Sequence, residues 1–313
     1  MKLIKWEKDI STNLPIICIF QLINTLLCLG GILIRVAFFT LLERKIIGLI
    51  HYRIGPRKLI IWGISQPLRD AAKLLCKETI RNSYSKKIIY LFAPILGIVL
   101  IIILWFFYYF SSGEISSIKI LSIIIISSLR VFIFLLTRWG SFSKYALLGG
   151  YRAIGQTISY EACLWAIILI LFYFCEIPFI NNYFIKFSLF LIFPILFLIW
   201  LFLWLAELNR TPFDIAERES ELVSGYNVEY RGGLFTVLFI AEYGFILFVA
   251  YLTCRVFWRA GGIIETKILV IRRILVWIRC SFPRIRYERI MTLSWKIILP
   301  FVCLILPFVN IIV

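Results

Sequence analysis

The sequence predicts an all-α, polytopic membrane protein, a bundle of about eight transmembrane helices with one short amphipathic helix at the membrane interface. Hydrophobic residues make up 62% of the 313 residues, against roughly 45–50% in a soluble domain. The mean hydropathy is +0.95. The apolar residues also form runs of about 20 or more, the length that crosses a bilayer. We therefore expect residues 1–313 to form a single integral membrane domain.

Eight apolar runs are candidate spans. The first run is too long for the apolar core of a signal peptide, so we expect it to be retained. The third, fourth, sixth and seventh runs are interrupted by charged residues. The eight runs cover residues 14–42, 88–110, 118–137, 144–174, 187–208, 230–258, 263–282 and 291–312.

A short helix is predicted between the first two spans, over residues 65–77. Ser65 can cap this helix, and Pro67 suits its first turn. Its composition fits an amphipathic helix in the membrane interface and an ordinary loop helix packed on the bundle equally well. Its apolar stripe consists of Leu68, Ala71, Ala72 and Leu75.

The basic residues indicate how the chain crosses the membrane. The net charge is +17, which in a soluble protein would suggest nucleic-acid binding. Here the basic residues lie mostly between the apolar runs, where they indicate topology and contact lipid headgroups, so we expect no nucleic-acid partner. They are concentrated in the odd-numbered loops, which predicts that those loops face the inside and both termini the outside.

The residue types that hold metals and redox cofactors are scarce or widely spaced. None of the eight cysteines forms a Cys-x-x-Cys pair, and His51 is the only histidine. These facts argue against zinc, iron–sulfur and paired-histidine haem sites. The sequence also lacks a glycine-rich nucleotide loop. We therefore expect partner subunits to carry the electrons in any redox reaction, and we assign His51 no role.

Carboxylates are the most informative residues. A carboxylate at membrane depth costs about 2.5–3.5 kcal/mol on insertion scales, so its presence suggests a function. Glu161 and Glu242 lie inside apolar runs. A further six acidic residues lie close together between two spans, at Glu207, Asp214, Glu217, Glu219, Glu221 and Glu229.

The segment Thr211–Asp214 predicts the start of a helix that ends near Gly225. Thr211 would be the cap, Pro212 the first helical residue and Asp214 part of a capping box. Spacings of three and four then place Asp214, Glu217 and Glu221 on one face. Repulsion and burial both favour protonated carboxyl groups, as a proton relay requires. A solvated acidic helix outside the membrane remains an equal alternative.

Glu161 also has two interpretations. Gln156, Thr157, Ser159 and Tyr160 precede it, which suggests a hydrated polar seam. Alternatively, Glu161 pairs with Arg152 or Arg130 for structural reasons alone. The arginines between Trp277 and Tyr287 are typical of topology signals and lipid anchors.

Several motifs in order along the chain resemble one known family, subunit 1 of the proton-pumping NADH:quinone oxidoreductases. They are residues 42–48 (LERKIIG), 53–56 (RIGP), 66–67 (QP), 156–161 (QTISYE), 206–214 (AELNRTPFD), 219–225 (ESELVSG), 229–230 (EY), 242–243 (EY), 277–279 (WIR) and 283–287 (PRIRY).

The resemblance implies a core membrane subunit that forms the access tunnel for ubiquinone, its substrate, and an acidic link between quinone reduction and proton translocation. Such a chain contains no complete active site and binds no flavin, haem or iron–sulfur cluster itself. Its implied partners are the quinone-site and iron–sulfur subunits of the peripheral arm, other membrane-arm subunits and membrane lipids. Composition and length favour the mitochondrial inner membrane over a bacterial one.

The resemblance also assigns residues by position. The acidic link would consist of Glu161, Glu207, Asp214, Glu217, Glu221, Glu229 and Glu242. The tunnel or partner interface would include Arg44, Arg53, Arg210 and Arg279.

Two arginines depart from the family pattern. Arg218 lies where glycine is usual, one turn beyond Asp214, and is expected to pair with it. Arg231 lies where a small residue is usual. Other classes of protein remain as alternatives, namely a membrane subunit of a hydrogenase- or ferredoxin-linked proton pump, or a stand-alone proton-coupled transporter.

Overall fold

The computed structural model describes residues 27, 29–57, 63–79, 85–110, 117–176, 190, 193–215, 225–258 and 264–312. Every regular element in these ranges is helical. The first is a helix over residues 29–50. The others are α2 (Gln66–Cys76), α3 (Lys87–Phe110), α4 (Ser117–Ser128), α5 (Arg130–Ser141), α6 (Lys144–Glu176), α9 (Pro194–Glu207), η2 (Gly225–Asn227), α11 (Gly232–Phe257), α12 (Ile264–Ser281), α13 (Tyr287–Thr292), the π-helical η3 (Leu293–Ile298) and α14 (Leu299–Ile312).

Four of the helical stretches in the described ranges are long and apolar enough to cross a membrane: Lys87–Phe106, Leu121–Ser141, Lys144–Leu171 and Gly232–Phe257. These match the second, third, fourth and sixth predicted spans. The all-α prediction is therefore confirmed for the described residues. The third span differs in detail, because a turn at Leu129 divides it into α4 and α5 and it continues to Ser141.

The predicted amphipathic helix corresponds to α2. Pro67 lies in its first turn, but Ser65 makes no side-chain capping hydrogen bond, so that part of the prediction is wrong. Leu68 and Leu75 are 69% and 67% exposed. The apolar stripe is therefore not packed on the bundle, although α2 contacts α11.

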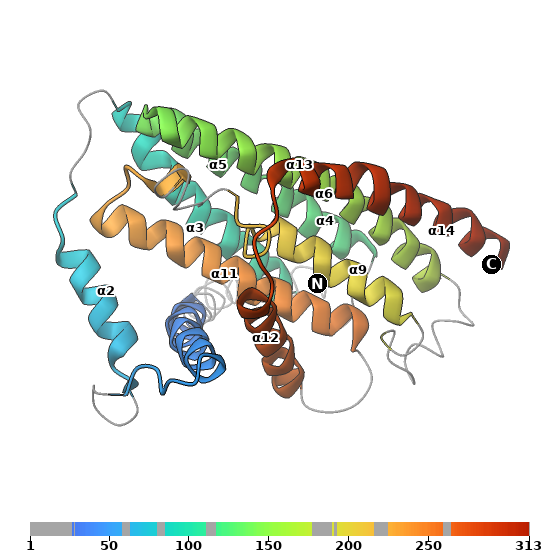
Figure 1. Cartoon of the computed structure of the whole chain (residues 1–313), viewed down its shortest axis with the longest axis horizontal. Helices are drawn as coiled ribbons and strands as arrows, with labels where there is room; N and C mark the ends of the chain where they lie inside the picture. Colours follow the sequence, from blue (N-terminus) through green and yellow to red (C-terminus); the bar gives the residue numbers. More distant parts are fainter. Residues whose placement is uncertain are drawn as a thin grey trace, which may run out of the picture.

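The long helices lie alongside one another in a bundle, with α2 at one edge (Figure 1). Here α3 packs against α5 and α11, and α6 packs against α5, α9 and α14. Small residues allow close approach. At Gly140 of α5, a Cβ atom would come within 2.9 Å of the backbone of Tyr90 in α3. The helix over residues 29–50 and α12 lie together on another side of the bundle (Figure 1), joined by ion pairs.

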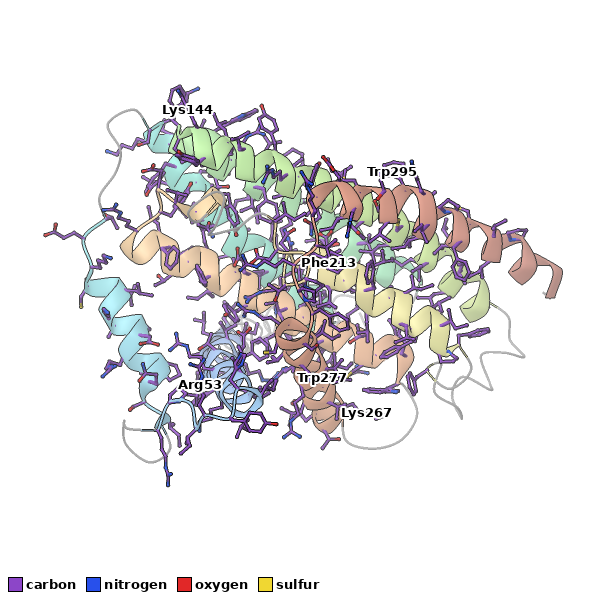
Figure 2. The ribbon with its side chains drawn as sticks, in the orientation of Figure 1. Arg53, Lys144, Phe213, Lys267, Trp277 and Trp295 are labelled. Atoms are coloured by element: carbon purple, nitrogen blue, oxygen red, sulfur yellow. The ribbon has the colours of Figure 1, made fainter. Side chains whose placement is uncertain are left out.

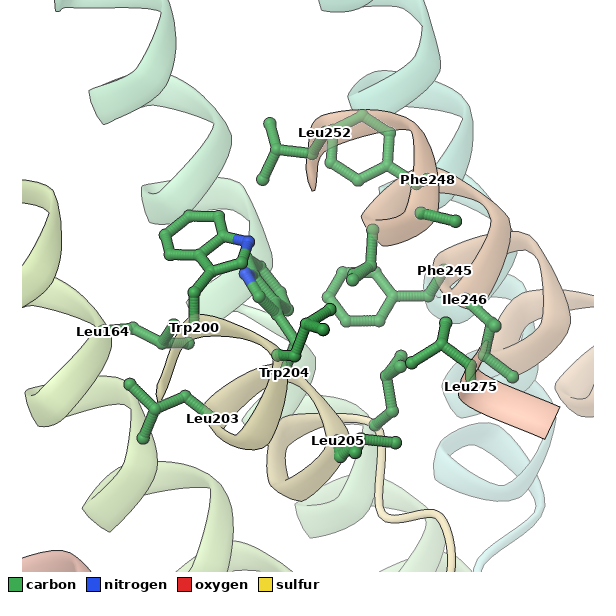
Figure 3. Close-up of a cluster of buried hydrophobic side chains, with 14 of the residues drawn as sticks. Leu164, Trp200, Leu203, Trp204, Leu205, Phe245, Ile246, Phe248, Leu252 and Leu275 are labelled. Atoms are coloured by element: carbon green, nitrogen blue, oxygen red, sulfur yellow. The ribbon is translucent and has the colours of Figure 1, made fainter. Parts of the chain in front are cut away.

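The core is centred on aromatic residues of α9. Trp200 and Trp204 are each 1% exposed, and their rings meet at 71° with centroids 5.6 Å apart. Figure 3 shows them facing Phe245 and Phe248 of α11, with Leu275 of α12 nearby. The packing of α9 between α6 and α11 fixes the end of α9, where the predicted acidic residues begin.

Candidate functional site

A buried ion cluster lies where the helix over residues 29–50, α11 and α12 meet. We call it the Glu43 cluster, and it consists of Glu43, Arg210, Tyr243 and Arg279. The Arg279 Nη1 group donates to Glu43 Oε1, and Arg210 Nη1 lies 3.6 Å from the same oxygen. Tyr243 Oη donates to Glu43 Oε2 over 2.9 Å.

Burial makes these contacts strong. Glu43 is only 5% exposed, and a buried carboxylate is stable only when charged or hydrogen-bonded groups compensate it. The guanidinium of Arg210 also lies 4.5 Å from the centroid of the Tyr243 ring, a cation–π contact. The cluster therefore holds two cations and one anion against an aromatic ring.

A pocket opens at the Glu43 cluster. Its charged lining comes from Glu43, Arg210 and Arg279, and the rest of it is apolar. Pockets that bind small molecules commonly combine an apolar wall with a few polar groups that orient the ligand. The apolar lining residues are Phe39, Leu205, Leu208, Ile246, Leu275 and Val276.

A second cluster lies deeper among the helices, and we call it the interior acidic cluster. It consists of Arg130 on α5, Glu161 on α6, Glu207 at the end of α9 and Glu242 on α11. Arg130 interacts electrostatically with Glu207 and Glu242, and Glu207 interacts with Glu161. The structure therefore brings together three carboxylates that are predicted from the sequence, with Arg130 beside Glu207 and Glu242. Glu161 hydrogen-bonds with Trp165 and Ser128.

Arg130 is held by aromatic rings and by the backbone. Its guanidinium lies 4.4 Å from the Phe245 ring centroid and 5.5 Å from that of Phe134. Its Nη2 group donates to the backbone oxygen of Glu207. Arg130 and Glu242 also line an otherwise largely apolar pocket between α3, α5 and α11.

Residues 208–215 link the two clusters, and we call them the connecting turn. Glu207 lies just before it, and Arg210 lies within it. Gln156 of α6, which is fully buried, donates through Nε2 to the backbone oxygens of Ala206 and Phe213 over 2.7 and 2.9 Å. Thr211 Oγ1 donates to the backbone oxygen of Arg279 over 3.2 Å. Hydrogen bonds between these residues and α6 and α12 thus fix the end of α9 and the connecting turn.

The predicted helix start at Thr211 is wrong for the described residues. Residues 211–215 form a turn and a bend, with a cis peptide bond between Thr211 and Pro212. A helix starting there would use the Pro212 and Phe213 oxygens as acceptors within the helix. Instead, the Pro212 oxygen accepts from the backbone N–H of Ile285, and the Phe213 oxygen accepts from Gln156 and Ile215. Long-range hydrogen bonds therefore replace the local ones.

Asp214 is buried and lies near a different arginine from the one predicted. Its Oδ2 atom is 3.6 Å from Arg284 Nη2, and Asp214 is 8% exposed. The predicted pair with Arg218 lies outside the described residues, as do Glu217, Glu219 and Glu221. The shared acidic face proposed for Asp214, Glu217 and Glu221 therefore stays a prediction.

The remaining predicted site residues belong to neither cluster. Arg44 pairs with Asp70 of α2 at 2.6 Å and is half exposed. Arg53 is exposed in the loop after the first helix, at the periphery of the molecule, whereas Phe213 of the connecting turn lies near its centre (Figure 2). Glu229 precedes α11, and its backbone oxygen accepts from Tyr90 Oη over 2.9 Å. His51 is exposed.

Glu43 is the main residue that the sequence-based assignment omits. It lies in the LERKIIG motif, where it directly precedes the basic residues Arg44 and Lys45. Its position in helical register with Phe39 at the end of an apolar run was the available signal, because that register faces the bundle. Within the described ranges, no group of three or more His, Cys, Asp or Glu side chains is arranged to hold a metal ion.

Comparison with known proteins places the chain in a family. A family model described as NADH dehydrogenase matches residues 23–310. The chain is similar to proteins named NADH-ubiquinone oxidoreductase chain 1. The relative from Dasypus novemcinctus is 43% identical over 299 residues, 89% of this chain and 92% of the relative. The Aedes aegypti relative is 42% identical over 292 residues, 90% and 92%. The Rhipicephalus sanguineus relative is 41% identical over 276 residues, 86% and 87%. The chain therefore belongs to the NADH dehydrogenase family, as a core membrane subunit of the respiratory-chain NADH-ubiquinone oxidoreductase, complex I.

Proposed function

We propose that this chain forms the access tunnel for ubiquinone and links its reduction to proton translocation. The observation that carries the proposal is the connecting turn. It joins the Glu43 cluster, which opens to a pocket, to the interior acidic cluster, and only two residues separate Glu207 from Arg210. A displacement of Arg210 in the Glu43 cluster can therefore move Glu207 in the interior acidic cluster, because both residues belong to one short segment of the chain.

The Glu43 cluster supplies the chemistry expected of a tunnel wall. Its apolar lining suits an isoprenoid chain, and Tyr243 with the two arginines can orient a polar quinone head or stabilise negative charge during reduction. Reduction of ubiquinone to ubiquinol takes up two electrons and two protons. Partner subunits of the peripheral arm deliver the electrons and complete the quinone site.

The interior acidic cluster supplies groups that can hold protons. Glu207 interacts electrostatically with Arg130 and Glu161, and Arg130 interacts with Glu242, so the gain or loss of one proton alters the electrostatic field at the other groups. Arg210 and Glu207 belong to the same short segment, so a displacement of Arg210 during quinone reduction would reach Glu207. Asp214, Glu217, Glu221 and Glu229 would extend this acidic set toward the partner subunits, and Arg44 and Arg53 would lie at the partner interface.

The proposed topology has eight spans in the mitochondrial inner membrane, with the odd-numbered loops on the matrix side. The spans would be the helix over residues 29–50, α3, α4 with α5, α6, α9, α11, α12, and α13 with η3 and α14. Alternating connections place the Glu43 cluster toward the matrix ends of the first and seventh spans. That end faces the peripheral arm, as the access route requires.

Photoaffinity labelling of the assembled complex tests the tunnel. A ubiquinone analogue with a photoreactive tail should label peptides that contain residues 39–43, 205–210 or 275–279, and excess ubiquinone should prevent the labelling. Arg279→Leu should reduce the labelling, whereas Arg289→Leu on the exposed side of α13 should not. Labelling confined to other subunits, with none in this chain, would exclude the proposed tunnel.

A further inference from the structure

A separate group of charged residues lies between the helix over residues 29–50 and α12. We call it the arginine cluster, and it consists of Arg35, Glu265, Arg272 and Arg273. The Arg35 Nη2 atom lies 3.3 Å from Glu265 Oε1. Arg272 interacts electrostatically with both Glu265 and Arg35, and Arg273 beside it is exposed. Two arginines therefore share one carboxylate, and a third arginine follows directly in the sequence.

This charge balance is unusual for its position. Arginine in the apolar part of a span is rare and is normally compensated by an acidic group or by backbone oxygens. The Arg272 Nε group is buried and has no hydrogen-bond partner within the described ranges. Glu265 can neutralise only one of the three cations. The cluster therefore leaves an excess of positive charge that an additional anion would stabilise.

The surroundings of the cluster are apolar and face outward. On the first helix, Ile34 and Phe38 are four residues apart, so they share one face, and they are 59% and 44% exposed. On α12, Leu269 and Val270 are 38% and 44% exposed. An occupant must therefore combine an anionic group for the arginines with apolar chains for these side chains.

The cations reach toward the end of the bundle at which α12 begins. Arg35 extends to Glu265 in the first turn of α12. Arg272 interacts with Cys254, which lies in the last turn of α11. Long basic side chains commonly extend in this way from an apolar position to the headgroup region. Lys267 and Trp277, on either side of Arg272 in the sequence, mark this part of α12 in Figure 2.

We propose that the arginine cluster binds the phosphate of an anionic phospholipid from the leaflet at which α12 begins, with the acyl chains lying against Ile34, Phe38 and Leu269. Charge complementarity favours an anion, and the exposed apolar residues favour one that carries hydrocarbon chains. Free phosphate would leave these apolar residues without a partner. This inference concerns a surface separate from the Glu43 cluster and does not depend on the proposed tunnel.

Photo-crosslinking of the assembled complex in nanodiscs tests the proposal. A photoreactive phosphatidylglycerol should label the peptide spanning residues 264–281. Excess phosphatidylglycerol should prevent the labelling, and neither phosphatidylcholine nor inorganic phosphate should do so. This competition uses the unmodified complex, so it does not depend on how variants assemble.

Substitutions of single arginines show which of them bind the phospholipid headgroup. Each arginine near an anionic headgroup contributes about 1 kcal/mol, or about a five-fold change in affinity, so Arg272→Leu should weaken labelling about five-fold and the double change with Arg273→Leu further. Both changes make α12 more apolar, which favours insertion. The matched control, Arg286→Leu with Arg289→Leu, removes two exposed cations elsewhere and should leave labelling of α12 unchanged.

Three results would overturn the proposal. Equal labelling in the unmodified complex and the Arg272→Leu, Arg273→Leu variant would show that the arginines do not bind the headgroup. Displacement by inorganic phosphate would indicate a site for small anions. A crosslink from α12 to an acidic residue of another subunit, with no lipid labelling, would assign the cluster to a protein contact.

Discussion

Glu43 is a single carboxylate that forms ion pairs with two arginines and accepts a hydrogen bond from a tyrosine. If it loses its charge, Arg210 and Arg279 remain partly or largely buried without an anion. Breaking a buried ion pair by removing one partner typically costs about 3–5 kcal/mol, whereas exposed pairs contribute about 0–1 kcal/mol. The chain contains a useful exposed counterpart in the pair of Arg44 and Asp70, whose side chains are 53% and 33% exposed.

We predict that Glu43→Gln lowers the melting temperature of the purified complex and impairs quinone reduction, because the amide cannot neutralise the two arginines. Asp70→Asn, the matched change in the exposed pair, should alter the melting temperature little. Differential scanning fluorimetry and NADH:ubiquinone assays measure these effects. Equal melting temperatures for the two variants would mean that burial does not strengthen the Glu43 cluster.

Gln156 is the second residue with a large expected effect. Its side-chain amide donates one hydrogen bond to the end of α9 and one to the connecting turn. Leaving a buried backbone oxygen without a donor costs about 1–3 kcal/mol. We predict that Gln156→Met, which has a similar length and no donor, speeds hydrogen exchange in residues 206–213 of the assembled complex. Thr292→Ala, which removes a local hydrogen bond to Arg289 on the exposed side of α13, is the control. Unchanged exchange after Gln156→Met would show that other contacts hold the turn.

At the scale of elements, the helices could be predicted and the connecting turn could not. Hydropathy predicts α3, α6 and α11 because long apolar runs form helices in a membrane wherever they occur in the sequence. The turn depends on Gln156, which lies 50 residues before Ala206 and 57 before Phe213. A local pattern such as Thr-Pro-Phe-Asp cannot reveal that a distant amide occupies a backbone acceptor.

The sequence likewise identifies some residues of the candidate site and misses those whose role depends on long-range contacts. Glu161, Glu207 and Glu242 could be identified because carboxylates within apolar runs are costly and therefore conspicuous. The sequence offers Arg130 only as a structural partner of Glu161, because its interaction with Glu207 and Glu242 depends on how α5, α9 and α11 pack. The pairing of Asp214 with Arg284 likewise needed the three-dimensional arrangement.

The close packing of α5 and α6 depends on a glycine, Gly150, which has no side chain. A Cβ atom at Gly150 of α6 would lie 2.9 Å from Cδ and 3.0 Å from Cβ of Arg138 on α5. Arg138 is 4% exposed, and its guanidinium lies 3.6 Å from the Tyr151 ring centroid, so it has little room to move. Overpacking of this kind typically costs about 1–3 kcal/mol.

We therefore predict that Gly150→Ala lowers the melting temperature and that adding Arg138→Ala restores part of the loss, because the truncated side chain frees the space. Gly233→Ala on α11 is the control, since nothing lies within 4 Å of the added atom and alanine favours helix. A melting temperature that falls as much for Gly233→Ala as for Gly150→Ala would rule out the steric explanation.

For the whole molecule, the distribution of basic residues predicts the direction of insertion. Arg57 lies in the loop after the first helix and Thr266 in the first turn of α12; both are exposed, and they lie on opposite sides in the proposed topology. In sealed mitoplasts of a Cys76→Ser background, which removes an exposed native cysteine of α2, a membrane-impermeant thiol reagent should label Thr266→Cys. Arg57→Cys should become accessible only after the membrane is opened to the matrix side. The reverse pattern would invert the topology.

The coupling of the two clusters is a property of the assembled complex, and neutral variants of the interior acidic cluster test it. Glu207→Gln and Glu242→Gln keep the size of each side chain and remove its ability to bind and release a proton at neutral pH. Glu288→Gln, in the exposed first turn of α13, is the matched control.

The measurement compares NADH oxidation by a hydrophilic artificial acceptor with NADH:ubiquinone activity and proton uptake or release in sealed vesicles. We predict that both interior variants assemble, oxidise NADH with the artificial acceptor at the normal rate, and lose most quinone activity together with the proton gradient, while Glu288→Gln retains all three. Full quinone activity with normal pumping in Glu207→Gln and Glu242→Gln would contradict the proposed link, and loss of the assembled complex would show that these carboxylates are structural.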